Sequence, residues 1–129
     1  MGEQKREHRA VSFDLTTTAT TANQQIGTYT PKVRDHFVIQ LIIIEVYLTT
    51  LDTTAALLGN LSLYFPKYLE YILKDLQASN TSSGALFGLI IPIPEGWFEK
   101  HYLSEIKAIC TPAVATSMKW IVTLLGYDK

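Results

Sequence analysis

Three histidines and one cysteine are the side chains of this sequence best suited to catalysis or metal binding. They are His8, His36, His101 and Cys110. Zinc sites group cysteine and histidine at short, fixed spacings, and these four residues have no such spacing. Asp35 precedes His36, but adjacent side chains of a helix point about 100° apart and do not form one acid/base site. The sequence also contains no phosphate loop, G-x-S-x-G or H-E-x-x-H motif.

We therefore predict a protein that is not an enzyme, with no catalytic residue, cofactor or metal site. An enzyme would require His36 or His101 to meet a carboxylate from a distant segment. Cys110 lies among apolar residues, and we expect it to be a small buried side chain rather than a nucleophile.

Basic residues near the N-terminus suggest a different chemistry, the binding of phosphate groups. Residues 1–36 hold every arginine of the chain, and the candidates are Lys5, Arg6, Arg9, Lys32 and Arg34. Cations in a mobile segment or at a helix start can contact a nucleic-acid backbone without reading its sequence. A solvated tail is the alternative. The whole chain has 11 Lys+Arg against 12 Asp+Glu and a net charge of −1, which argues against a strongly basic monomer that binds nucleic acid alone.

The composition changes near residue 31. The chain of 129 residues is long enough for one domain. Residues 1–30 contain seven threonines, and their few large apolar residues are Val11, Phe13, Leu15, Ile26 and Tyr29. Such a segment cannot bury much surface, so we predict an extended polar arm over 1–30 and a helical domain over 31–129.

Helix boundaries and apolar spacing predict the fold of residues 31–129. Thr30 and Pro31 are typical of a helix start. The apolar segment Val33–Leu51 is long for a strand and favours a helix, although its isoleucines and valines would equally suit a buried strand. Further helices are predicted over 52–65, 66–76, 95–110 and 112–125, with the i, i+3, i+4 spacing of one apolar face. The expected fold class is all-α: a compact four- to five-helix bundle with an extended N-terminal arm.

The predicted helices have too little polar surface for an isolated bundle. The chain is 47% hydrophobic and only 18% charged. A helix that is apolar on all sides must be buried on all sides, and four short helices surround it only partly. Contiguous apolar surface usually marks a partner interface, so self-assembly is favoured over a fold that closes on itself. The longest apolar run, Phe37–Leu48, is too short and too polar to span a membrane.

This layout resembles the major coat proteins of filamentous archaeal DNA viruses, the rudivirus, lipothrixvirus and tristromavirus group. The resemblance rests on the polar arm, the helix start Thr30-Pro31-Lys32 and the C-terminal stretch from Ile106 to Gly126. It implies a helical bundle whose arm wraps double-stranded DNA held in A-form. It also implies that two similar subunits pair and stack into a filament, with a lipid envelope in some members.

On this resemblance, the chain is a structural virion protein, assembled in the host cytoplasm, that wraps double-stranded DNA without sequence specificity. The DNA contacts map to the five basic residues of the arm and first helix, with a homologous partner subunit supplying further phosphate contacts. The alternative is a non-enzymatic helical interaction module that uses the arm as a docking peptide. Such a module could be a capsid cement protein, a membrane-peripheral scaffold or a small regulatory dimer.

Overall fold

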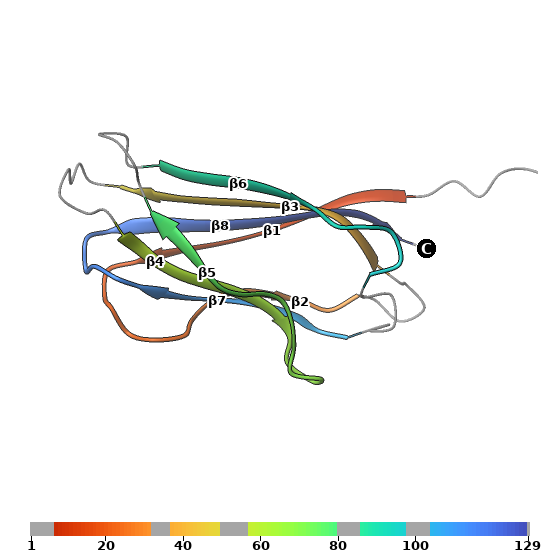
Figure 1. Ribbon diagram of the computed structural model, residues 1–129, viewed down its shortest axis with the longest axis horizontal. Coiled ribbons are helices and arrows are strands. Elements are labelled where there is room, and N and C mark those ends of the chain that lie inside the picture. Colours follow the sequence, from red (N-terminus) through yellow and green to blue (C-terminus); the bar gives the residue numbers. More distant parts are fainter. Residues whose placement is uncertain (1–6, 32–36, 50–56, 80–85, 98–103, 129) are drawn as a thin grey trace, which may run out of the picture.

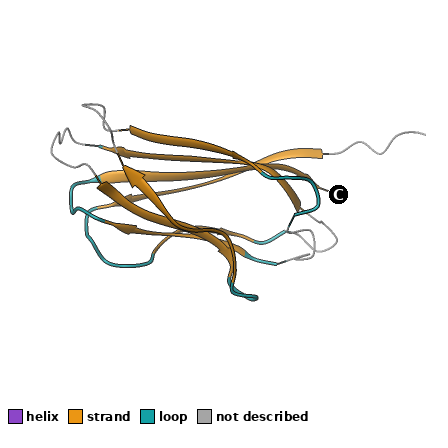
Figure 2. Ribbon diagram, viewed as in Figure 1, coloured by secondary structure: helices purple, strands orange, loops and turns teal. Residues whose placement is uncertain are grey.

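Strands make up the regular structure of the described part of this protein. The computed structural model describes residues 7–31, 37–49, 57–79, 86–97 and 104–128, and within them it contains no helix (Figure 2). The strands are β1 (Glu7–Thr17), β2 (Gln24–Tyr29), β3 (Phe37–Leu48), β4 (Leu57–Phe65), β5 (Glu70–Ser79), β6 (Leu86–Pro92), β7 (Ile106–Pro112) and β8 (Met118–Asp128). The predicted all-α helical bundle is therefore wrong. No helix able to cross a membrane occurs in the described part of the chain.

The strands form two antiparallel sheets that face each other (Figure 1). One sheet has the order β1-β8-β3-β6 and the other has the order β2-β7-β4-β5. The chain changes sheet at every connection except that between β4 and β5. An eight-stranded double sheet with this order is a jelly roll.

The predicted extended arm is also wrong, because its residues supply a strand to each sheet. β1 pairs with β8 from Glu7 to Thr17, and β2 pairs with β7. Phe13 and Ile26 are buried in the core, and the buried Thr17 hydroxyl accepts a 2.9 Å hydrogen bond from the indole N–H of Trp120. Threonine is β-branched and suits a strand. The predicted boundary at residue 31 falls just before residues 32–36, which lie outside the described residues.

The segment predicted as the central helix is β3. Its residues Ile42, Ile44, Val46 and Leu48 are buried between the sheets, while the residues between them point to the outer face. Inward and outward side chains alternate in a strand, but in β3 both sets are largely apolar. The alternation was therefore invisible as a polar/apolar pattern, and the strand alternative left open for Val33–Leu51 is the observed one.

The predicted helix over 66–76 is a turn followed by β5. Leu73 and Leu76 both pack against the core although they are three residues apart. This is possible because the β4–β5 register shifts between Leu61 and Leu63, with Asp75 in the left-handed region at φ 50°. The Asp75 N–H donates a 2.9 Å hydrogen bond to the Ser62 hydroxyl. An irregular strand thus produced a helix-like spacing. The C-terminal helix prediction fails more simply, since β8 is a regular strand that buries Met118, Trp120, Val122 and Leu124.

Candidate assembly surface

Of the five basic residues predicted to bind nucleic acid, the structure describes only Arg9. Its guanidinium donates to the Asp128 carboxylate at 2.5 Å and to the Tyr29 hydroxyl at 3.2 Å. These contacts join β1 to β8 and β2, and the Asp128 side chain is only 11% exposed. Arg9 therefore has a structural role in the described fold. Lys5, Arg6, Lys32 and Arg34 lie outside the described residues.

The residues singled out for catalysis or metal binding form no site within the described segments. His8 packs edge-on against Tyr127, with ring centroids 6.1 Å apart, whereas His36 and His101 lie outside those segments. Cys110 is buried on the inner face of β7, as expected, and burial raises the pKa of its thiol to about 12. No group of three or more histidine, cysteine, aspartate or glutamate residues that could hold a metal ion occurs in the part of the chain that the structure describes.

The most distinctive surface is the outward side of the sheet β1-β8-β3-β6, here called the apolar outer face. It is formed by five aliphatic side chains on three neighbouring strands: Leu41, Ile43, Ile90, Ile121 and Leu125. Each points outward because an adjacent residue of its strand points into the core, although Gln40, beside Leu41 at a register shift, is exposed.

The register brings these side chains together. Leu41 lies opposite Leu125 on β8, and Ile43 lies opposite Ile90 on β6. Ile90 is 63% exposed, although it is a large aliphatic residue, while the other four are half-buried. By the register, Leu41, Ile43, Ile90 and Leu125 are neighbours of one another, whereas Ile121 lies diagonally from Ile43, with Asp14 and Glu45 opposite it on the two adjacent strands.

The same face becomes polar toward β1. Lys119 lies 3.3 Å from the Asp14 carboxylate, and the hydroxyls of Ser12 and Thr123 are 3.2 Å apart. The aliphatic area is therefore bordered by polar groups on one side and by the edge strand β6 on the other. An aliphatic area with a polar border is typical of a protein interface.

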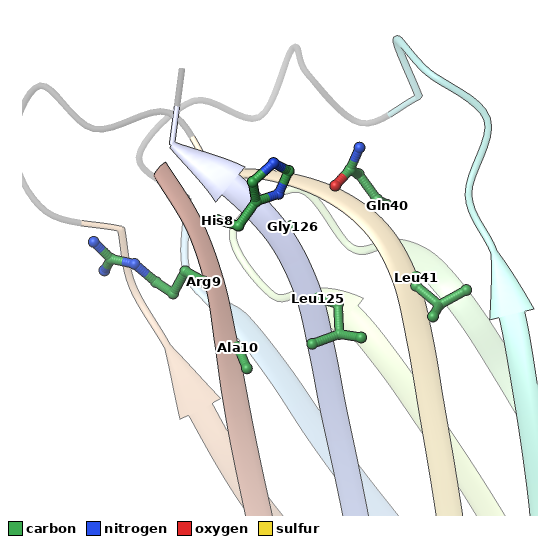
Figure 3. Close-up of a pocket in the computed structure, with 7 residues that line it drawn as sticks. All are labelled: His8, Arg9, Ala10, Gln40, Leu41, Leu125 and Gly126. Carbon is green, nitrogen blue, oxygen red and sulfur yellow. The ribbon is translucent and has the colours of Figure 1, made fainter. Parts of the chain in front are cut away.

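Two hollows mark this face. One, of about 600 Å³, lies where β1, β8 and β3 run together, and Figure 3 shows Ala10, Leu125 and Leu41 along it, with His8 and Gln40 at its end. The Arg9 side chain extends to the other side of β1 (Figure 3), consistent with its bond to Tyr29. The second hollow, of about 440 Å³, is lined by Ile43, Glu45, Gly88 and Ile90 among others.

The apolar outer face is a site that the sequence analysis did not locate, although it predicted under-covered apolar residues and self-assembly. Leu41, Ile43, Ile121 and Leu125 fall within the predicted helices, and Ile90 falls between the helices predicted over 66–76 and 95–110. The sequence signal for this face was the apolar run in β3. Successive residues of a strand point to opposite faces, so a nearly continuous apolar run places apolar side chains on both faces of the sheet.

Comparison with known proteins identifies no family, since no family model and no curated protein matches the chain. Among solved structures, it is similar to a chain of the cyanophage Pam1 capsid asymmetric unit, at 15% identity and a TM-score of 0.49, over 98% of this chain and 89% of that chain. It is similar to a chain of the Triatoma virus empty capsid at 12% identity and a TM-score of 0.38, over 95% and 87% of the two chains. It is also similar to a carbohydrate binding module of Cel9A from Ruminococcus flavefaciens FD-1, at 9% identity and a TM-score of 0.46, over 92% and 98%. Similarities at this level do not assign the chain to a family or a function.

Proposed function

We propose that this chain is a structural subunit that assembles with other coat subunits, copies of itself included, into the shell of a virus particle. The observation that carries the proposal is the apolar outer face formed by Leu41, Ile43, Ile90, Ile121 and Leu125. A subunit of a shell must present apolar surface to its neighbours, and this chain presents it on one four-stranded sheet.

The energetics of this face favour association. Full burial of an exposed leucine or isoleucine contributes roughly 1.5–3 kcal/mol. The four members that are already largely buried contribute at most about a third of that each, and Ile90, which is 63% exposed, contributes most. The strand order supports the viral part of the proposal, because the jelly roll is an architecture of viral capsid domains, although lectins and cupins share it. An aliphatic face suits subunit packing better than the binding of a hydroxyl-rich sugar, which requires hydrogen-bonding groups.

The finer predictions about nucleic acid remain predictions. They are the wrapping of double-stranded DNA through Lys5, Arg6, Arg9, Lys32 and Arg34, a helical filament, a similar partner subunit and a lipid envelope. The pairing of Arg9 with Asp128 disfavours its turning to a phosphate, because that would leave a largely buried carboxylate without its cation.

The proposal is tested by following the size of the purified chain with concentration, using sedimentation velocity and electron microscopy. We expect species far larger than a dimer, and Ile43→Lys should abolish them because a charge would lie in the centre of the apolar outer face. The matched control is Thr28→Lys, which places the same charge on an exposed position of the other sheet. A wild-type chain that stays monomeric, or that stops at a discrete dimer, would contradict the proposal, and the dimer would fit the interaction module instead.

A further inference from the structure

Among the described residues the two sheets have four edge strands, and three of these carry features that disfavour pairing with another chain. Charged side chains lie along β1, including Arg9 and Asp14. β5 has register shifts and a left-handed residue at Asp75. β2 is only 6 residues long and has a register shift between Gln25 and Gly27. Charges, bulges and shortness are the means by which natural sheets protect their edges.

β6 has neither charges nor a register shift, and its protective features are limited to Pro92 at its end and a length of 7 residues. Its sequence, Leu86–Pro92, contains no charged residue, and its register with β3 is unbroken from Leu41–Pro92 to Tyr47–Leu86. It forms the rim of its sheet, with no described strand beyond it (Figure 1). An apolar edge of this kind is a template for a further strand.

The hydrogen bonding shows which backbone groups of β6 are free to pair. The Ile93 N–H donates to the Gln40 carbonyl at 2.9 Å. Since hydrogen-bonded and non-hydrogen-bonded pairs alternate in an antiparallel ladder, Leu89 and Ile91 direct their N–H and C=O groups to β3. Gly88 and Ile90 direct theirs to the open edge. Pro92 falls on the same outward set, where its missing N–H removes no bond to β3.

We propose that β6 pairs antiparallel with β6 of a second copy, about a two-fold axis at Leu89. Gly88 then lies opposite Ile90 of the second copy, and each exchanges both backbone hydrogen bonds with the other. The side chains match as well. Ile90 is 63% exposed, whereas a Cβ at Gly88 would meet nothing within 4 Å. Ile90 of one copy therefore fills the space over Gly88 of the other, at the hollow of about 440 Å³.

The pairing also joins the apolar outer faces of the two copies. Ile43 and Ile90 lie on the β6 side of that face, so the two aliphatic areas meet at the two-fold axis and the polar β1 edges lie at the far ends. This inference rests on the proposed function, because a strand of 7 residues is far smaller than the roughly 20–30 residues a side of a stable interface. The pairing is expected to be weak in an isolated pair and to strengthen within an assembly.

Disulfide trapping tests the pairing and its register. Leu89→Cys places the cysteines of the two copies opposite each other as a non-hydrogen-bonded pair. Their Cα atoms would be about 4.5 Å apart, which is within the range of a disulfide. Ile90→Cys is more exposed, yet its nearest counterpart is a diagonal neighbour at about 7–8 Å, which is too far. Under mild oxidation we expect at least about tenfold more covalent dimer from Leu89→Cys than from Ile90→Cys. The native Cys110 is buried and does not interfere.

A second pair of variants separates loss of pairing from loss of folding. Gly88→Lys has room in the monomer but places a charge where Ile90 of the second copy packs, so it should abolish the Leu89→Cys cross-link. Thr28→Lys should leave the cross-link unchanged. Equal cross-linking of Leu89→Cys and Ile90→Cys, or cross-linking that survives Gly88→Lys in a folded chain, would overturn the inference.

The outcomes also separate this inference from the proposed function. Large assemblies without a cross-link at position 89 would retain the function and overturn the β6 pairing. A cross-linked dimer that never grows would support the pairing and overturn the shell. A chain that stays monomeric and does not cross-link would overturn both.

Discussion

The outer faces of the two sheets differ in chemistry although both belong to the same sandwich. The sheet β1-β8-β3-β6 presents the apolar outer face. The sheet β2-β7-β4-β5 presents Tyr64 stacked on Tyr71, with ring centroids 5.0 Å apart, and Lys74 5.3 Å from the Tyr71 ring. Lys107 lies beside Tyr64 in the register. One face thus offers aliphatic surface for burial, and the other carries aromatic and charged groups that satisfy one another. Under the proposed function, the difference favours the sheet β1-β8-β3-β6 as the side that contacts other subunits.

Deleting residues 1–30 has the largest expected effect, because it removes one strand from each sheet. The deletion exposes the edges of β8 and β7 and removes Phe13, Thr17 and Ile26 from the core. We expect a chain without cooperative thermal unfolding by circular dichroism. If the truncated chain still unfolded cooperatively, residues 1–30 would not be part of the folded core and would be an independent arm.

A substitution at each of two neighbouring residues compares the inner and outer surfaces of one strand. Ile44 is fully buried, whereas Ile43 lies on the apolar outer face. Ile44→Ala should lower the free energy of unfolding by about 2–5 kcal/mol, measured by urea denaturation. Ile43→Ala should lower it by less, about 1–2 kcal/mol, because the side chain is only partly buried in the monomer, and should also weaken self-association. If both variants reduced stability equally, Ile43 would not be a surface residue.

How far the sequence predicts this structure depends on which residues are considered. Burial of Cys110 followed from its apolar neighbours, and an under-covered apolar surface followed from composition. The fold class did not, because β3 is apolar on both faces and the irregular β5 places Leu73 and Leu76 on one side at helical spacing. The register shift in β5 depends on its pairing with β4, and the local spacing of apolar residues does not report which strand pairs with which. The location of the apolar outer face requires the strand order and was therefore out of reach.

Cys110 extends the comparison to the inner side of the sheet β2-β7-β4-β5. In the folded chain its thiol has a pKa of about 12, raised by burial from 9.0. Above pH 9 the unfolded chain loses this proton while the folded chain keeps it. Stability should therefore be unaffected by this group below pH 9 and fall as the pH rises, by at most about 1.4 kcal/mol per pH unit. Urea denaturation of wild type and Cys110→Ala from pH 8 to 10.5 gives the difference between their free energies of unfolding. This difference should change with pH if the thiol is buried and stay constant if it is exposed to solvent.

The smallest effect is expected on the face opposite the apolar outer face, where Tyr71 is 38% exposed and stacks on Tyr64 at an interplanar angle of 21°. Tyr71→Ala removes both the stacking and the contact with Lys74, and the loss of an aromatic pair costs about 0.5–1.5 kcal/mol. Tyr71→Phe keeps the ring and should have nearly wild-type stability. Neither variant should change the concentration at which the chain assembles, as followed by light scattering. If Tyr71→Ala prevented assembly while its monomer stayed folded, the aromatic face would be a subunit contact as well, and the two faces would no longer have separate roles.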